Sequence, residues 1–316
     1  MLRDDCTALW NNLSTVLSGI PIRVTMQQIK TVGVVGCGIM GSGIAQVAAQ
    51  SGFQVFIFDE NADAVKKAQT GIDASLQKQV NKAKLTLEQK KSVLAHIVCA
   101  NDLADFAVCN LIIEAVFDKL EIKTKLFSEL DRICHPDTIL ASNTSSLSII
   151  DIAAATRRMD KVVGMHFFNP VPVMQLVEVV KSIATGQETL ETAKDFGNRL
   201  GKKVIEAPDV PGFIHNRLTT VLSIAAVEML ERGLASRDDI DNALKFGSNF
   251  PMGRLELMDM VGLDTLLAGY ENLYREYKDP RYAPPLLLKR MVAAGWLGRK
   301  SGRGFYTYDK DGNKVG

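Results

Sequence analysis

Residues 31–60, TVGVVGCGIMGSGIAQVAAQSGFQVFIFDE, decide the fold of this chain. Thr31–Val35 is a short β-branched run bounded by glycine, which predicts a buried strand. An amphipathic pattern then predicts a helix to about Gln50, and Gln54–Phe58 predicts a second strand that ends in Asp59. The stretch therefore predicts a β-α-β unit with a glycine-rich turn between its first strand and its helix.

The glycine-rich turn fits the pattern G-x-G-x-x-G, with Ile39 and Met40 between its last two glycines. Gly36 permits a tight turn, Gly38 lets the backbone approach a pyrophosphate, and Gly41 allows the helix to pack closely on the strand. The pattern alone also fits an ordinary tight turn. Its place after a strand, with an acidic residue 18 positions after Gly41, favours a dinucleotide-binding site.

The acidic residue that closes the second strand indicates which dinucleotide binds. The Asp59 carboxylate can accept hydrogen bonds from the ribose hydroxyls of an adenosine. Glu60 and Asp63 lie beside it in the sequence with no arginine, so a 2′-phosphate would be repelled. The sequence therefore predicts NAD rather than NADP as the cofactor.

Beyond this unit the pattern keeps alternating between short strands and longer helices. Further strands are predicted at Leu111–Glu114, Ile139–Ala141, Val162–Phe167 and Leu176–Val180. Helices are predicted near Asp118–Cys134, near Thr189–Leu200, and over residues 62–96 with a break near Leu85–Thr86. This alternation predicts an α/β fold, a Rossmann-type mostly parallel sheet covered on both faces.

The strand signal ends at PDVPG, residues 208–212, which is the best candidate for a domain boundary. The helices predicted after it are Phe213–Arg232, Asp238–Lys245, Asp264–Tyr277 and Leu286–Ala294. We therefore expect a nucleotide-binding domain over residues 26–210 and an all-helical C-terminal domain over residues 211–316. Residues 1–25 are expected to form an appendage of unknown role.

Composition and charge exclude several classes of function. The 316 residues are 47% hydrophobic and 23% charged, which is ordinary for a globular protein of two domains. The net charge of +1 provides no overall field for nucleic acid or an anionic membrane, and no apolar run is long enough for a transmembrane helix. Five cysteines without a C-x-x-C pair predict neither a disulfide framework nor a metal site.

Because residues 1–25 resemble no secretory or transit leader, we expect a cytoplasmic protein rather than one of the mitochondrial matrix.

Two neighbouring segments of the α/β region carry candidate catalytic groups. His166 lies in a strand followed by Asn169, and Glu178 interrupts the otherwise apolar strand that comes next. A histidine in an apolar strand is by itself more often a core residue. A buried carboxylate without a partner is costly, however, so Glu178 would be explained if it held one ring nitrogen of His166. The other nitrogen would then be free to take a proton.

Two further polar residues stand beside this pair in the predicted fold. Ser145 follows the strand Ile139–Ala141 in the segment SNTSSL, and Asn216 opens the helical region in PGFIHNRL. The hydroxyl can be read as a helix N-cap, or as a group pointing into the crevice where open α/β sheets bind ligands. The amide of Asn216 could face back across the cleft between the domains.

The glycine loop, SNTSSL, HFFNPVPVMQLVEVV and PGFIHNRL together resemble the L-3-hydroxyacyl-CoA dehydrogenase family, in particular its short-chain, 3-hydroxybutyryl-CoA branch. The segments GSNFPMGRLELMDMVGLD and GRKSGRGFY also resemble it, and the likeness covers roughly residues 29–310. The resemblance implies reversible, NAD-dependent oxidation of an (S)-3-hydroxyacyl-CoA to a 3-oxoacyl-CoA. It also implies a homodimer that pairs through the helical domain.

The resemblance implies a role for each matching residue. His166 corresponds to the catalytic base, Glu178 to the carboxylate that orients it, and Ser145 and Asn216 to the groups that position the substrate oxygen and thioester. The cofactor contacts implied by it, beyond the glycine loop, are Ser145, Lys123, Asn169, Lys300 and Asp118, the last at a position where the family commonly has glutamate. The helical arm over residues 62–96 is implied to hold coenzyme A, through Ser75 and Lys82.

Three alternatives stay open. The first is a 3-hydroxyadipyl-CoA dehydrogenase of aromatic degradation, which an extra cationic residue in the acyl pocket would indicate. The second is a non-catalytic, crystallin-like binding protein, against which the joint presence of the four catalytic candidates argues. The third is a dehydrogenase of free β-hydroxyacids, which would leave HFFNP and the helical arm unexplained.

Overall fold

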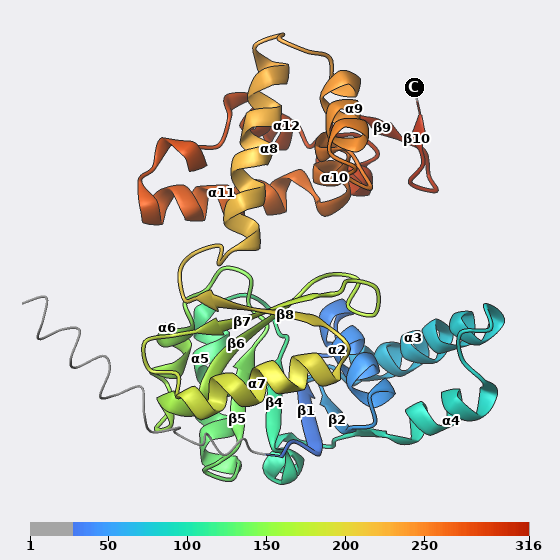
Figure 1. Cartoon of the computed structure of the whole chain (residues 1–316), viewed down its shortest axis with the longest axis vertical. Helices are drawn as coiled ribbons and strands as arrows, with labels where there is room; N and C mark the ends of the chain where they lie inside the picture. Colours follow the sequence, from blue (N-terminus) through green and yellow to red (C-terminus); the bar gives the residue numbers. More distant parts are fainter. Residues whose placement is uncertain (1–27, 316) are drawn as a thin grey trace, which may run out of the picture.

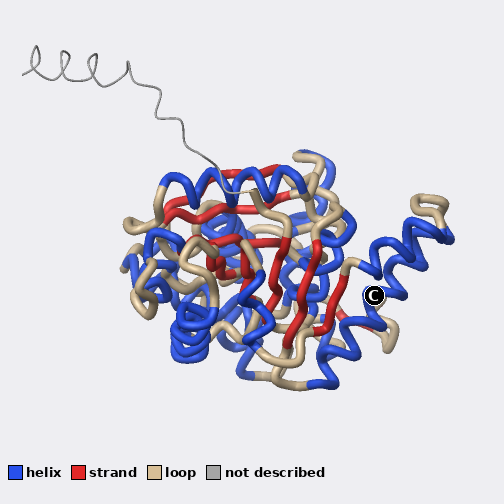
Figure 2. The backbone as a smooth tube through the Cα atoms, turned by 90° about the horizontal axis from the view of Figure 1, so that it is seen from below, coloured by secondary structure: helices blue, strands red, loops and turns tan. Residues whose placement is uncertain are grey.

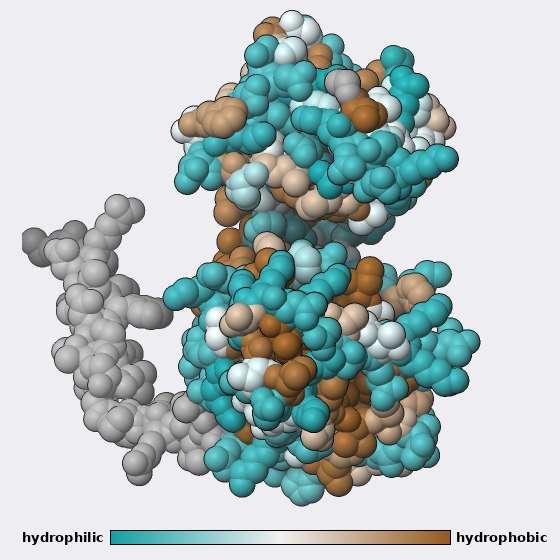
Figure 3. Space-filling model, turned by 90° about the vertical axis from the view of Figure 1, so that its right-hand side faces the viewer, coloured by the Kyte–Doolittle hydropathy of each residue, from teal (hydrophilic) through white to brown (hydrophobic). Residues whose placement is uncertain are grey.

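The computed structural model describes residues 28–315 of the chain. They form two lobes, a lower one built on a β-sheet and an upper one built of helices (Figure 1). In the space-filling view the lobes meet across a narrow waist beside which apolar side chains gather (Figure 3). The predicted appendage, residues 1–25, lies outside the described residues.

The lower lobe contains an eight-stranded sheet in the order β3-β2-β1-β4-β5-β6-β7-β8. The strands are β1 Thr31–Val35, β2 Gln54–Phe58, β3 Ile97–Cys99, β4 Leu111–Glu114, β5 Ile139–Ser142, β6 Val162–Phe167, β7 Leu176–Lys181 and β8 Lys203–Pro208. All neighbouring pairs run parallel except β6 and β7, which are antiparallel. The predicted Rossmann-type, mostly parallel sheet is confirmed.

Helices cover both faces of this sheet (Figure 2). They are α2 Ile39–Gln50, α3 Ala62–Asn81, α4 Leu87–Ala95, α5 Leu120–Ile133, α6 Ile149–Ala153 and α7 Gln187–Arg199. Successive residues of a strand point to opposite faces, so Val34 packs in one core with Ile44 of α2, while Val35 packs in the other with Phe127 of α5. This double burial explains why the central strands are continuous apolar runs.

The sequence pattern did not predict the two edge strands. β3 has only three residues, and β8 is half-exposed and carries lysine and glutamate. The apolar run of β3 is too short to indicate a strand, and the exposed positions of β8 break the apolar run by which the central strands were found.

The helical arm projects from the lower lobe as a pair of helices, α3 and α4 (Figure 1). The turn between them ends at Thr86, where the sequence predicted a break. The Thr86 side chain accepts from the Gln89 backbone, and the Gln89 side chain accepts from the Thr86 backbone. This capping box starts α4 as a new helix.

The upper lobe is helical, as predicted, with one added helix. It contains α8 His215–Glu231, α9 Arg237–Gly247, α10 Arg254–Val261, α11 Leu263–Tyr277 and α12 Leu286–Ala293. The sequence pattern missed α10, whose apolar and polar residues are not segregated to separate faces. A small hairpin of β9 Thr307–Tyr308 and β10 Lys314–Val315 is a further addition to the predicted all-helical region.

Candidate active site

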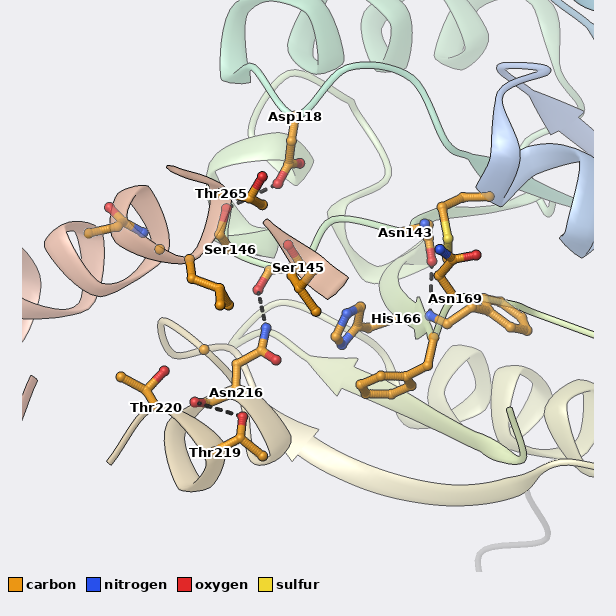
Figure 4. Close-up of a pocket in the computed structure, with 18 of the residues that line it drawn as sticks. Asp118, Asn143, Ser145, Ser146, His166, Asn169, Asn216, Thr219, Thr220 and Thr265 are labelled. Carbon is orange, nitrogen blue, oxygen red and sulfur yellow. Dashed lines mark hydrogen bonds between the residues drawn. The ribbon is translucent and has the colours of Figure 1, made fainter. Parts of the chain in front are cut away.

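A cavity of about 520 Å³ lies between the two lobes and is lined by residues of both. Figure 4 shows polar side chains that converge on it from the sheet and from the helices. The predicted site residues that line it are Met40, Asp118, Lys123, Ser145, His166, Asn169 and Asn216. Residues far apart in the sequence therefore meet at the carboxyl ends of the strands, where open α/β sheets bind ligands.

His166 and Glu178 face each other across the antiparallel pair β6 and β7. The Nδ1 atom of His166 lies 2.7 Å from Oε2 of Glu178. His166 is 6% exposed and Glu178 is completely buried, so the carboxylate lies beneath the imidazole and away from the cavity. Since Nδ1 is held by the carboxylate, Nε2 is the ring nitrogen available to a ligand, and Figure 4 shows the ring directed into the cavity.

The second oxygen of Glu178 ties the site to the helical lobe. Its Oε1 atom accepts hydrogen bonds from the backbone N–H groups of Ile214, at 3.1 Å, and His215, at 2.8 Å, where α8 begins. Burial raises the pKa of Glu178, but the bonds from His166, His215 and Ile214 outweigh it and lower the pKa below its ordinary value of 4.5. The carboxylate is therefore ionised at neutral pH and can stabilise a protonated His166.

The first turn of α8 carries Asn216 to the opposite wall of the cavity. Its Nδ2 atom donates to the backbone oxygen of Ser145 at 3.4 Å, and its Oδ1 atom lies 3.2 Å from Nδ1 of His215. Asn143 steadies the adjoining loop, because its Oδ1 accepts from the backbone of Phe167 at 2.9 Å. Ser145, Asn216 and His166 thus surround one point of the cavity (Figure 4).

Lys123 is held in a buried ion pair that the sequence analysis did not predict. Its Nζ atom lies 2.5 Å from Oε1 of Glu114 and 3.4 Å from Oδ1 of Asp118. Glu114 also accepts hydrogen bonds from Ser142 and from the backbone of Val116. Asp118 has a shorter side chain than the glutamate common in the family, yet its Oδ1 atom reaches Lys123. Its Oδ2 atom accepts a hydrogen bond from the Ser146 hydroxyl.

The glycine loop has the shape that a dinucleotide needs. Gly36 has a φ of +100°, and a Cβ atom there would lie 2.6 Å from the backbone oxygen of Ala115. A Cβ atom on Gly41 would lie 1.7 Å from the backbone oxygen of Gly36, so the helix can approach only without a side chain. Next to Gly38, by contrast, there is open space, and no side chain caps the N-terminus of α2. The free N–H groups there fit a pyrophosphate.

Asp59 lies beside this loop at the end of β2. Its Oδ2 atom accepts from the backbone of Cys37 at 2.8 Å, and its Oδ1 atom accepts from the backbone of Asn61 at 2.9 Å. These bonds fix the carboxylate and leave further lone pairs for ribose hydroxyls. Ile39 is 77% exposed at the start of the helix.

Three predicted contact residues lie outside both the cavity wall and the glycine-loop region. Ser75, half-buried, and Lys82, exposed, lie on the arm, the latter at the C-cap of α3. Lys300 lies in the helical lobe, where its Nζ atom is 2.6 Å from Asp264 at the start of α11. The structure therefore does not bring these three together with His166.

Three polar residues of the site were not predicted from the sequence: Asn143 and Arg254, which line the cavity, and Glu114, which is buried behind Lys123. Glu114 ends the apolar run LIIE, so it carries the same signal by which Glu178 was found. Arg254 had no signal, because an arginine at the start of a helix is ordinarily exposed. No group of three or more potential metal ligands occurs in residues 28–315, and none of their helices is long and apolar enough to cross a bilayer.

The fold and this site define an NAD-binding dehydrogenase with a separate helical lobe. The family profile "3-hydroxyacyl-CoA dehydrogenase, NAD binding domain" matches residues 31–210, and the profile "3-hydroxyacyl-CoA dehydrogenase, C-terminal domain" matches residues 212–308. The chain belongs to the NAD-dependent 3-hydroxyacyl-CoA dehydrogenase family. The resemblance seen in the sequence is thereby confirmed.

Several relatives are similar over most of their length. A 3-hydroxybutyryl-CoA dehydrogenase of Bradyrhizobium diazoefficiens is 46% identical over 89% of this chain and 96% of its own length. The mitochondrial hydroxyacyl-coenzyme A dehydrogenase of Homo sapiens is 43% identical over 89% of this chain and 91% of its own length. The crystal structure of an (S)-3-hydroxybutyryl-CoA dehydrogenase from Ralstonia eutropha superposes with a TM-score of 0.88, at 44% identity, over 90% of this chain and all of that chain. Because the relatives come from bacteria and from mitochondria, the cytoplasmic location stays a prediction.

Proposed function

We propose that this enzyme oxidises short-chain (S)-3-hydroxyacyl-CoA thioesters reversibly, with 3-hydroxybutyryl-CoA as the simplest substrate, and that His166 is the general base. The observation that carries the proposal is the buried bond between His166 Nδ1 and Glu178 Oε2, which directs the other ring nitrogen into the cavity. Relatives named for 3-hydroxybutyryl-CoA support the substrate.

In this proposal each protein group has one task. When bound, NAD accepts the hydride that leaves C3 of the substrate. His166 Nε2 takes the proton of the 3-hydroxyl group, and ionised Glu178 stabilises the imidazolium that forms. Ser145 and Asn216 position the substrate oxygen from opposite walls of the cavity.

The cofactor site is proposed on the fit of the glycine loop. Gly36, Gly38 and Gly41 with the N-terminus of α2 would hold the pyrophosphate, and Asp59 would accept from the adenosine ribose. Lys123, Asp118 and Asn169 line the cavity and would contact the ribose and nicotinamide part of the cofactor. Lys300 is a further candidate from the helical lobe, where its ion pair with Asp264 lies next to Thr265 of the cavity wall.

Substrate binding is proposed to extend to the helical arm. Ser75 and Lys82 belong to α3 and its C-cap, and the arm also carries other exposed lysines. Coenzyme A is a polyanion in its nucleotide part, so lysines on a projecting arm provide a complementary charge.

We also propose a homodimer through the helical lobe. Large apolar side chains are exposed there, including Leu218 (69%), Leu234 (68%) and Phe246 (80%). Exposed apolar groups of this size are typical of surfaces covered by a partner. Light scattering should give twice the mass of one chain, and Phe246→Asp should shift it toward the mass of one chain.

The test of the function is NADH consumption on addition of acetoacetyl-CoA. NADPH in place of NADH, and free acetoacetate in place of the thioester, are the matched controls. Turnover that requires both NADH and the thioester, and that is absent in both controls, supports the proposal. Equal turnover of free acetoacetate would contradict it.

A further inference from the structure

Arg254 is a buried arginine in the wall of the cavity, and no part of the proposed mechanism uses it. It is the first residue of α10, and it is 8% exposed. Its side chain bridges to α8, where Nε donates to the Ser223 hydroxyl at 2.6 Å and Nη2 donates to the backbone oxygen of Thr219 at 2.9 Å. Both acceptors are neutral.

The charge of Arg254 has no counterion within the described part of the chain. No carboxylate among residues 28–315 forms an ion pair with it, and its further neighbour, the Tyr270 hydroxyl, is neutral as well. A guanidinium has five N–H donors and keeps its proton in proteins. Since an unpaired buried charge is costly, a cation held in this way in a ligand cavity points to an anionic ligand.

A second polar group lies at the same end of the cavity. The Tyr270 hydroxyl is buried beside the Arg254 guanidinium and the Ser223 hydroxyl, and Tyr270 lines the cavity together with Arg254. Burial raises the pKa of Tyr270 above its ordinary value of 10.0, so the hydroxyl is neutral and can donate. Arg254 and Tyr270 together offer a cation and a neutral donor to one acceptor group.

This end of the cavity lies beyond the reacting centre along α8. Thr219 and Ser223 follow Asn216 by three and seven residues, a rise of roughly 5 and 10 Å along the helix axis. Figure 4 shows Asn216, Thr219 and Thr220 in succession on this helix, with His166 on the sheet side. A substrate whose C3 oxygen lies between His166 and Asn216 can therefore extend its acyl chain toward Arg254.

We propose that Arg254, with Tyr270, binds a carboxylate at the far end of the acyl chain, so that the preferred substrates are short (S)-3-hydroxyacyl-CoA thioesters of dicarboxylic acids. This inference rests on the proposed function and specifies its acyl group. A guanidinium binds a carboxylate with charge-assisted bonds, and an acyl chain that ends in a methyl group would leave Arg254 without a counterion in the complex.

The test compares two six-carbon thioesters, 3-oxoadipyl-CoA and 3-oxohexanoyl-CoA, which differ at the chain end by a carboxylate. With NADH and the full chain, we expect kcat/KM to be about 10- to 100-fold higher for 3-oxoadipyl-CoA, the range for hydrogen bonds to a charged group. Arg254→Gln should reduce this ratio to near one. Arg290→Gln, which removes an exposed arginine of α12, is the matched control and should keep the ratio.

Tyr270→Phe serves as a second variant if Arg254→Gln does not fold, and it should reduce the ratio by a smaller factor. A wild-type enzyme that prefers 3-oxohexanoyl-CoA would overturn the inference, as would a parallel loss of both activities in Arg254→Gln, which would assign Arg254 to the common part of the substrates. Turnover of acetoacetyl-CoA in either case leaves the proposed function standing. No turnover of any of the three thioesters would overturn the function, and this inference with it.

Discussion

His166 and Glu178 are direct neighbours across the only antiparallel strand pair of the described eight-stranded sheet. The antiparallel pairing places the carboxylate beneath the imidazole, 2.7 Å from its Nδ1 atom, and the other carboxylate oxygen accepts hydrogen bonds from the start of α8. One buried carboxylate thereby orients the proposed base and anchors the helix that carries Asn216.

Glu178→Gln should lower kcat by about 10²-fold or more, because an amide can hold the ring but cannot stabilise its charge. Binding of NADH should change little, since Glu178 lies outside the cavity wall. Steady-state rates and NADH titration by fluorescence measure the two effects. A loss confined to NADH affinity would contradict the orienting role.

The same variant predicts a pH dependence of stability. The pKa of Glu178 is lowered in the folded state, so its ionisation stabilises the fold above its ordinary pKa of 4.5, and this contribution is lost as the pH falls through the folded-state pKa. Urea unfolding should show Glu178→Gln less stable than the wild type at pH 7, by about 1–3 kcal/mol, with the gap narrowing below pH 4.5. A stability difference between the two proteins that does not change with pH would contradict a stabilising role of the ionised carboxylate.

The buried pair of Lys123 and Glu114 predicts non-additive stability. Lys123→Met leaves the Glu114 carboxylate buried without its cation, and should cost about 3–5 kcal/mol of unfolding free energy. Lys123→Met combined with Glu114→Gln should recover part of that loss. Chemical denaturation of the wild type, the two single variants and the double variant measures the coupling energy between Lys123 and Glu114. Additive losses of unfolding free energy would mean that the pair does not act as a unit.

Asp59→Asn should raise the KM for NADH by about 10-fold, because a charged acceptor for the ribose is replaced by a neutral one. It should also reduce the preference of the enzyme for NADH over NADPH. Asp137→Asn is the matched control, since Asp137 is an exposed aspartate outside the glycine loop and the cavity wall. An unchanged preference for NADH would assign the selectivity to another group.

Lys82→Gln should raise the KM for acetoacetyl-CoA several-fold, while an N-acetylcysteamine thioester, which lacks the nucleotide, should be unaffected. Lys91→Gln removes another exposed lysine of the arm and is the control. The effect should weaken as salt is added, because exposed charges are screened. Equal losses with both thioesters would contradict nucleotide binding by the arm.

The parts of the site that the sequence predicted are those with a local signal. Gly36, Gly38 and Gly41 are required by backbone geometry, and Glu178 stands out because a carboxylate interrupts an apolar strand. Arg254 and Tyr270 carry no such signal, because their burial arises only when α10 and α11 pack against α8. The edge strand β8 was missed for a related reason, since its partly exposed position leaves its sequence polar.

The most direct test of the central claim is the rate of acetoacetyl-CoA reduction by His166→Gln, with His135→Gln, an exposed histidine, as the control. The account predicts that kcat falls by about 10²–10⁴-fold for His166→Gln, the range for a positioned acid–base group, while the NADH dissociation constant stays within a few-fold. A kcat within a few-fold of the wild type would contradict it.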